Sequence, residues 1–179
     1  PVRTEGTVTC SPNGNDGDGH NLSYSFEWVD GADAVFATDA GVESTIDIAN
    51  YLGNELSEGE TVTCRVTAND GHQDSATEEV STKVNNRPSI TPSLDSDPVS
   101  TIGTLTCTPN GVDDDSEALT YTYEWVNESD TVFVNDTGAT STIDLPTYLS
   151  TDLVEGEMVT CRVIANDGHE ESTSAQASA

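Results

Sequence analysis

Basic side chains are scarce in this chain, and their scarcity excludes several kinds of partner. The 179 residues include 5 Lys and Arg against 33 Asp and Glu, which gives a formal net charge of −28. Proteins that bind nucleic acid do so largely through Lys and Arg on phosphates, so we expect no nucleic-acid partner. Adhesion to anionic lipid through charge is disfavoured for the same reason. Such acidity is typical of a soluble protein or of one that binds cations.

Long apolar runs are missing as well. No stretch approaches the roughly 20 apolar residues that a transmembrane helix needs, so we expect no membrane span in this segment. No secretory signal peptide is recognisable, which fits a mature protein or an internal fragment. The cysteines form no Cys-x-x-Cys pair, which argues against a zinc site built on them.

What the chain does contain is a long internal repeat. Leu22–Val29 (LSYSFEWV) returns as Leu119–Val126 (LTYTYEWV), and Glu58–Val66 returns as Glu155–Val163. The offset is about 97 residues in both cases, a usual length for one small domain. Two homologous repeats therefore fill the chain.

The phase of the repeat sets the expected boundaries and shows a gap. We expect a first repeat, a linker and a second repeat at residues 1–84, 85–88 and 89–179. Pro1 aligns with Pro98, so the first repeat has no counterpart of Ser89–Asp97, which has the pattern of a short, Pro-marked edge strand. That strand is missing from the first repeat, or a neighbouring repeat or identical subunit supplies it by strand addition. An arbitrary chain end is the plainer explanation, and both fit a segment of a longer array.

The cysteines recur with the repeat. Cys10 and Cys64 have the same spacing as Cys107 and Cys161, which favours one disulfide within each repeat. Domains of this size need such covalent help, and disulfides imply an oxidising compartment. We therefore expect an extracellular or cell-surface location; four reduced cytosolic thiols are the alternative.

Alternation of apolar and polar residues predicts an all-β chain. Thr7–Cys10 alternates, and two longer series in the first repeat do the same: Leu22, Tyr24, Phe26 and Trp28, then Val62, Cys64, Val66 and Ala68. The second repeat matches both series. Only Ile48–Leu56 has helical character, of one turn at most. On the outward faces, we expect Arg65 and Arg162 to pair with acids on neighbouring strands, such as Glu27 and Glu124.

A strand with Cys, a later strand with an inward Trp and a third strand with Cys resemble the immunoglobulin-like fold. The resemblance implies two tandem antiparallel β-sandwiches, each with one disulfide between its sheets and the Trp packed on it. The tyrosine corner of antibody domains is absent, because Val62 and Val159 stand two residues before the second cysteines. Kinship with antibodies or receptors is therefore not supported.

Several short sequence motifs resemble those of Ig-like, cadherin-like and polycystic-kidney-disease-like repeats of large microbial surface or adhesin proteins more closely than those of antibody domains. They are Asp113-Asp114-Asp115, Tyr123-Glu124-Trp125, Ala165-Asn166-Asp167-Gly168 and Asn85-Asn86-Arg87-Pro88. The likeness implies a non-catalytic structural or adhesive module of an extracellular stalk, adhesin or filament. Its partners would be neighbouring repeats of the same polypeptide or identical subunits.

The acidic loops favour calcium as a ligand, although no cofactor is required by the fold. Calcium binds carboxylate, amide and carbonyl oxygens on adaptable loops. In a sandwich of this kind the loops after the two cysteine strands meet at one end, beside the entering linker. We expect calcium ligands at the junction and in the first repeat among Asn85, Asn86, Asp113, Asp114, Asp115, Asn166 and Asp167, and among Asp16, Asp18 and Asp70. Because Asp, Asn and Gly also form turns readily, solvated acidic turns are the alternative.

Catalysis has little support in the sequence. The three histidines, His20, His72 and His169, fall in Gly-containing loops or turns, and no Ser-His-Asp or Cys-His pair is indicated. We therefore expect no enzyme. Sequons for N-glycosylation occur at Asn21, Asn127 and Asn135.

Two other functions remain open: a module that recognises a glycan or a protein, and an accessory domain of a secreted hydrolase. Exposed aromatic side chains at loop tips would favour recognition. The candidates recur in both repeats, which indicates core packing instead; they are Phe36, Tyr51, Phe133 and Tyr148.

Overall fold

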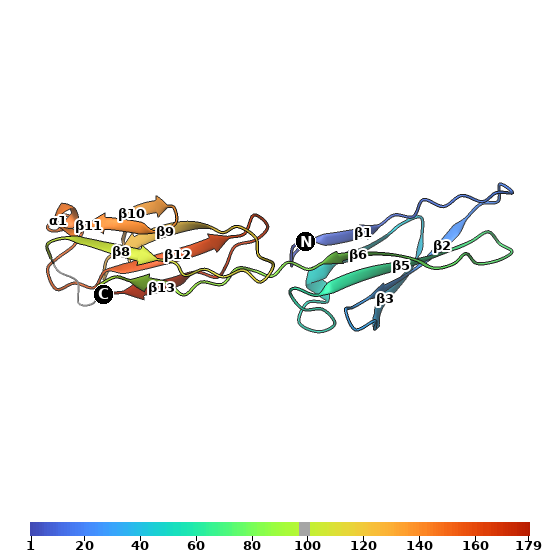
Figure 1. The fold of residues 1–179 in the computed structure, drawn as a ribbon, viewed down its shortest axis with the longest axis horizontal. Helices are drawn as coiled ribbons and strands as arrows, with labels where there is room; N and C mark the ends of the chain where they lie inside the picture. Colours follow the sequence, from blue (N-terminus) through green and yellow to red (C-terminus); the bar gives the residue numbers. More distant parts are fainter. Residues whose placement is uncertain (97–100) are drawn as a thin grey trace. The chain divides into compact units, whose positions relative to one another are not determined.

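The computed structural model describes residues 1–96 and 101–179 and divides into two compact units, Pro1–Asn86 and Arg87–Ala179 (Figure 1). Both units are built from antiparallel strands, as the alternating apolar pattern predicts. Two short helical turns, η1 (Ile48–Asn50) and α1 (Leu145–Tyr148), follow the strands β4 (Ser44–Asp47) and β11 (Ser141–Asp144). The predicted fold class is confirmed: an all-β chain with two tandem immunoglobulin-like sandwiches.

The first unit has a sheet of two strands and a sheet of four. The small sheet pairs β1 (Thr7–Cys10) with β4 (Ser44–Asp47). The larger sheet has the order β3 (Val35–Gly41), β2 (Ser23–Val29), β5 (Thr61–Asn69), β6 (Glu78–Lys83).

The second unit repeats this arrangement with one strand more. Its larger sheet has the order β10 (Val132–Thr137), β9 (Thr120–Val126), β12 (Thr160–Asn166), β13 (Ala175–Ser178). Its small sheet has the order β11 (Ser141–Asp144), β8 (Thr104–Thr108), β7 (Ser93–Leu94). The extra strand β7 belongs to the segment that sequence alignment leaves without a counterpart in the first repeat.

One disulfide joins the two sheets of each unit, as predicted. Cys10 on β1 is bonded to Cys64 on β5, and Cys107 on β8 is bonded to Cys161 on β12. In both bridges the Cα atoms lie 6.4 Å apart, and the sulfurs belong to the buried core.

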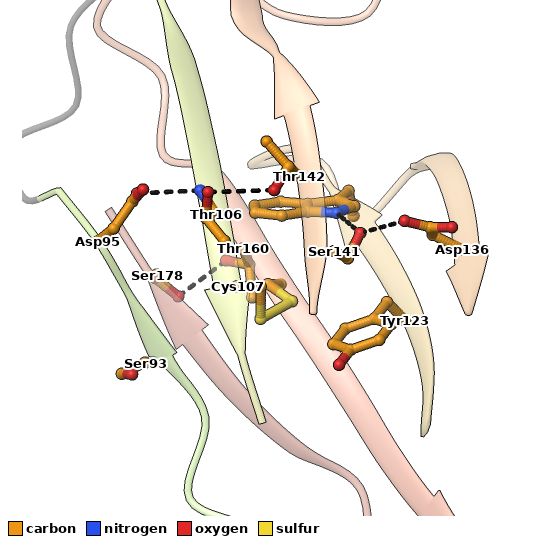
Figure 2. Close-up of a disulfide and its surroundings, with 12 residues drawn as sticks. Ser93, Asp95, Thr106, Cys107, Tyr123, Asp136, Ser141, Thr142, Thr160 and Ser178 are labelled. Carbon is orange, nitrogen blue, oxygen red and sulfur yellow. Dashed lines mark hydrogen bonds between the residues drawn. A yellow bond between two sulfur atoms is a disulfide. The ribbon is translucent and has the colours of Figure 1, made fainter. Parts of the chain in front are cut away.

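A buried tryptophan packs in each core and donates its one hydrogen bond inside the protein. Trp28 Nε1 donates to Ser44 Oγ at 2.9 Å, and Trp125 Nε1 donates to Ser141 Oγ at 2.9 Å. Ser141 Oγ in turn donates to Asp136 Oδ2 at 2.7 Å, as Figure 2 shows. The inward face predicted from alternation is confirmed, since both indoles are at most 1% exposed.

The four recurring aromatic side chains pack against the cores, as their recurrence predicts. The rings of Phe36 and Tyr51 lie 4.8 Å apart in the first unit, and those of Phe133 and Tyr148 lie 5.1 Å apart in the second. They therefore give no support to an aromatic recognition surface.

The outward arginines pair with acids other than the expected Glu27 and Glu124, although one of these acids, Glu79, lies on a neighbouring strand as predicted. Arg65 lies opposite Glu27 in register, yet it pairs with Asp33 and, at 2.7 Å, with Glu79 on β6. Arg162 pairs with Asp130. Asp33 and Asp130 lie in turns with φ of 69° and 62°. The geometry of these turns brings the aspartates to the arginines, and it cannot be read from the alternating pattern of the strands.

Candidate functional site

Two loops at one end of the first unit are each fixed by an aspartate. In the loop between β1 and β2, Asp16 Oδ1 accepts hydrogen bonds from the N–H groups of Asp18 and His20, both at 2.9 Å. In the turn between β5 and β6, Asp70 Oδ1 accepts from His72 at 2.7 Å and from Gln73 at 2.8 Å. These bonds lower the pKa of Asp70, with a smaller contribution from the His20 imidazole.

The two loops bring together side chains of the kind that bind metals. Potential ligand atoms of Asp16, His20 and Asp70 all lie within 4.8 Å of one another. The rings of His20 and His72 meet edge to face at 4.9 Å. Two of the predicted calcium ligands, Asp16 and Asp70, are therefore neighbours, whereas Asp18 is exposed and outside this set. Sequence reasoning placed His20 in a plain loop; its alignment with the acidic Glu117 was the signal that it missed.

The second unit builds its first loop in the same way. Asp113 Oδ1 accepts from the N–H groups of Asp115 at 2.8 Å and Glu117 at 3.3 Å. Asp167, aligned with Asp70 and 5% exposed, accepts from His169 and Glu170 at 2.6 Å. The homologous positions Asp16 and Asp113, and Asp70 and Asp167, thus shape equivalent turns.

Buried carboxylate oxygens distinguish the loop of the second unit. Among the described residues, Asp113 Oδ2 and Glu117 Oε2 are buried and accept no hydrogen bond. The pKa of Glu117 is raised, chiefly by burial and then by the neighbouring carboxyl of Asp113. An uncompensated pair of acids of this kind is the setting in which a bound cation stabilises the folded state. Asp114 is exposed.

The asparagines of the predicted calcium set have structural partners. Asn166 Oδ1 accepts from Gly168 at 2.7 Å, and Gly168 has a φ of 94°, so this side chain holds the turn. Asn85 is fully buried in the first unit and its Nδ2 donates to the carbonyl of Asn86 at 3.0 Å. The predicted approach of Asn85 and Asn86 to the acids of the second unit stays a prediction.

The three sequons differ in how available they are. Asn21 and Asn135 are exposed. Asn127 is engaged: its Oδ1 accepts from Ser129 and Thr131, and its Nδ2 donates to the carbonyl of Asp152 at 3.0 Å. A glycan on Asn127 would replace one of the two hydrogens of this Nδ2.

A groove of about 400 Å³ opens beside these loops in the first unit. Besides Asp16 and Asp70, the groove is lined by Asn13 and Leu22 of the loop between β1 and β2, and by Tyr24, Val66 and Ala68 of the larger sheet. The groove is therefore partly apolar and is bordered by acids at the loop end.

The corresponding place in the second unit is filled by the segment that leads into β7. Ser89 and Val112 exchange two backbone hydrogen bonds of 2.8 Å. Asn110, which aligns with Asn13, donates from Nδ2 to the carbonyl of Thr91 at 3.0 Å and to Ser93 Oγ at 3.1 Å. Ile90 and Leu94 pack against the core.

Aligned residues of the two units differ in burial, and the difference shows how much of the core the segment Ser89–Leu94 covers. Leu105, Val163 and Ala165 are fully buried in the second unit, whereas the aligned Val8, Val66 and Ala68 are only half-buried in the first. Val80 on β6 is 61% exposed, while the aligned Ala177 is half-buried. The first unit thus presents an open sheet edge with apolar side chains along it.

Comparison with known proteins finds only distant similarity, and only to solved structures. No family model matches the chain, and no curated protein matches it. Among solved structures, a two fibronectin type-III domain segment from chicken tenascin is 14% identical over 98% of this chain and 93% of that chain, with a TM-score of 0.40. The FN1–FN3 domains of chicken CNTN1 are 10% identical over 99% of this chain and 60% of that chain, with a TM-score of 0.37.

These low scores leave the fold assignment to the strand order and the disulfides of the chain itself. The finer resemblance to microbial surface repeats stays a prediction. Within residues 1–96 and 101–179, no helix is both long and apolar enough to cross a membrane.

Proposed function

We propose that this chain is a non-catalytic structural or adhesive segment of an extracellular stalk, adhesin or filament, in which repeats are joined by strand addition. Tandem disulfide-bonded sandwiches support a structural role and an oxidising location. The high negative charge keeps such an array soluble.

The open groove of the first unit is the observation that carries this proposal. An extended segment with the chemistry of Ser89–Leu94 fits it, because homologous residues hold that segment in the second unit. Its backbone would add to the free edge of β1, and apolar side chains like Ile90 and Leu94 would cover Val8 and Val66. A homologous segment, from a neighbouring repeat of the same polypeptide or from an identical subunit, would supply such a strand by strand addition.

Calcium binding at the loop end of the second unit is part of the proposal. The unpartnered oxygens of Asp113 and Glu117 support it, since a divalent cation would satisfy both. Because the pKa of Glu117 is raised, its carboxyl group holds a proton more readily, and calcium must displace that proton. The affinity of this site for calcium should therefore fall at low pH.

A peptide with the sequence of residues 87–96 tests the strand-addition proposal. Fluorescently labelled peptide is titrated with the full chain, and binding is followed by anisotropy. We expect saturable binding, and little binding of a peptide that carries Leu94→Asp, because a carboxylate would replace the apolar side chain that covers the core.

A matched pair of chain variants tests the site of binding. Asn13→Ala removes the side chain aligned with Asn110, which makes two hydrogen bonds to the covering segment, so we expect about tenfold weaker binding. Asn15→Ala is the control. The aligned Val112 forms hydrogen bonds to Ser89 through its backbone, which the substitution at Asn15 leaves in place. Equal binding of the normal and Leu94→Asp peptides, or no binding at all, would refute the proposal.

A further inference from the structure

We propose that the loop end of the first unit is a binding site for a divalent transition metal of the zinc class, formed by Asp16, His20 and Asp70, with the His72 ring packed against that of His20. This site goes beyond the structural role proposed above and does not depend on it. It also differs in chemistry from the calcium expected there from sequence, because imidazole enters the ligand set.

The argument starts from two imidazoles that come from separate loops and meet. The rings of His20 and His72 lie 4.9 Å apart, and His20 Nδ1 lies 3.4 Å from Asp16 Oδ1. The third histidine of the chain, His169, belongs to the other unit. Imidazole with carboxylate is a ligand set that suits zinc, copper and nickel, whereas calcium prefers oxygen alone.

The spacing of the ligand atoms is close to what such an ion requires. Zinc bonds to imidazole nitrogen and carboxylate oxygen are about 2.0–2.2 Å long, so ligand atoms around one ion lie about 3–4 Å apart. The atoms of Asp16, His20 and Asp70 lie within 4.8 Å of one another. The side chain of His20 is 45% exposed, so a small rotation brings it to bonding distance without disturbing the core.

The carboxylates are oriented in advance by the backbone. Asp16 and Asp70 each use Oδ1 to accept two N–H groups, which leaves Oδ2 of each for a metal ion. Hydrogen bonds of this kind hold ligands in place and increase metal affinity. These two loops also carry Asp18 and Asp74 besides Asp16 and Asp70, so a cation is attracted to this end of the unit.

The second unit provides an internal comparison. Asp113, Glu117 and Asp167 stand at the positions of Asp16, His20 and Asp70, so every one of these positions carries a possible ligand in both units. The exchange of His20 for Glu117 changes the ligand set from mixed nitrogen and oxygen to oxygen. The two loop ends are therefore expected to select different cations, a transition metal in the first unit and calcium in the second.

Titration of the full chain with Zn²⁺ and Ca²⁺, followed through the imidazole signals of the three histidines by NMR, tests this inference. The first equivalent of Zn²⁺ should shift His20 and His72 and leave His169 unchanged. Ca²⁺ in tenfold excess should not reverse these shifts. His20→Glu should weaken Zn²⁺ binding at this site by about 100-fold, since even outer-shell partners of a metal contribute about 10–100-fold.

His169→Gln is the matched control, because it removes a histidine from the same Asn-Asp-Gly-His phrase in the other unit and should leave the affinity at the first unit unchanged. A circular-dichroism spectrum checks that each variant is folded. The inference is wrong if the first equivalent of Zn²⁺ shifts His169 as much as His20, if Ca²⁺ displaces Zn²⁺, or if His20→Glu binds Zn²⁺ as tightly as the natural chain. Failure of Ca²⁺ to bind the second unit would refute only the calcium proposal.

Discussion

Replacement of Ser141 by alanine should destabilise the second unit through one buried hydrogen-bond donor. Trp125 is fully buried, and its Nε1 donates to Ser141 Oγ, which donates onward to Asp136 Oδ2 (Figure 2). Ser141→Ala removes the acceptor and leaves the indole N–H without a partner in a place that water does not reach. It also deprives the carboxylate of a donor.

The expected cost follows from these two losses. A buried donor left unsatisfied costs about 1–3 kcal/mol, so we expect the free energy of unfolding of the second unit to fall by about 2 kcal/mol. For a domain of this size that corresponds to a fall in melting temperature of about 8–16 °C. Amide hydrogen exchange in β9 and β12 should become about 30-fold faster where it requires global opening of the unit.

Hydrogen exchange read unit by unit is the suitable assay, because β2 and β5 of the first unit serve as an internal reference. Ser44→Ala is the matched variant. Ser44 accepts the equivalent hydrogen bond from the indole of Trp28, and Ser141 in addition donates a hydrogen bond to the carboxylate of Asp136. We expect Ser44→Ala to cost less than Ser141→Ala. A change below about 0.5 kcal/mol for Ser141→Ala, or a larger cost for Ser44→Ala, would show that this bond is not what stabilises the indole.

Tyr123 should titrate apart from the other tyrosines, because burial raises its pKa to about 12, and ultraviolet absorbance should show one late phenolate. Since the folded pKa lies above the unfolded value of about 10, the stability that this group contributes is present below pH 10 and is lost as the pH rises towards 12; a single tyrosine transition near pH 10 would contradict this. Gly59→Ala should destabilise its unit more than Gly156→Ala does, as measured by hydrogen exchange in each unit. Both positions have positive φ, of 77° and 89°, but a Cβ on Gly59 would lie 2.6 Å from Asn86 Nδ2, whereas no atom of the described residues lies within 4 Å of one on Gly156. Equal costs would mean that Asn86 moves aside freely.

Much of the fold could be predicted because its signals are periodic and local. Alternation around Trp28 and Cys64 specifies which faces are buried, and the equal spacing of the cysteines specifies one bridge in each repeat. The Asn-Asp-Gly phrases specify the turns that the structure shows at Gly71 and Gly168, both with positive φ.

The loop ends were less predictable, because contacts between loops depend on the folded backbone. Asp16 and Asp70 were expected at one end, whereas the alignment of His20 with Glu117 was an indirect signal, and the rings of His20 and His72 meet only when the two loops do. The partner of Arg65 was missed for a similar reason: register puts Glu27 opposite, but a turn brings Asp33 within reach. Residues 97–100, where the predicted segment Ser89–Asp97 ends, lie outside the described residues.

The position of the disulfides sets how far each unit can stretch under tension. Each bridge joins residues 54 positions apart, and an extended chain spans about 3.4 Å per residue. The bridge therefore prevents about 180 Å of polypeptide in each unit from extending when the unit is pulled by its ends. Force that unfolds the sandwich can release only the segments outside the bridge, which are less than half of each unit. A string of such units would therefore resist extension in oxidising surroundings, and its fully extended length would grow about 2.5-fold once a reductant opened the bridges.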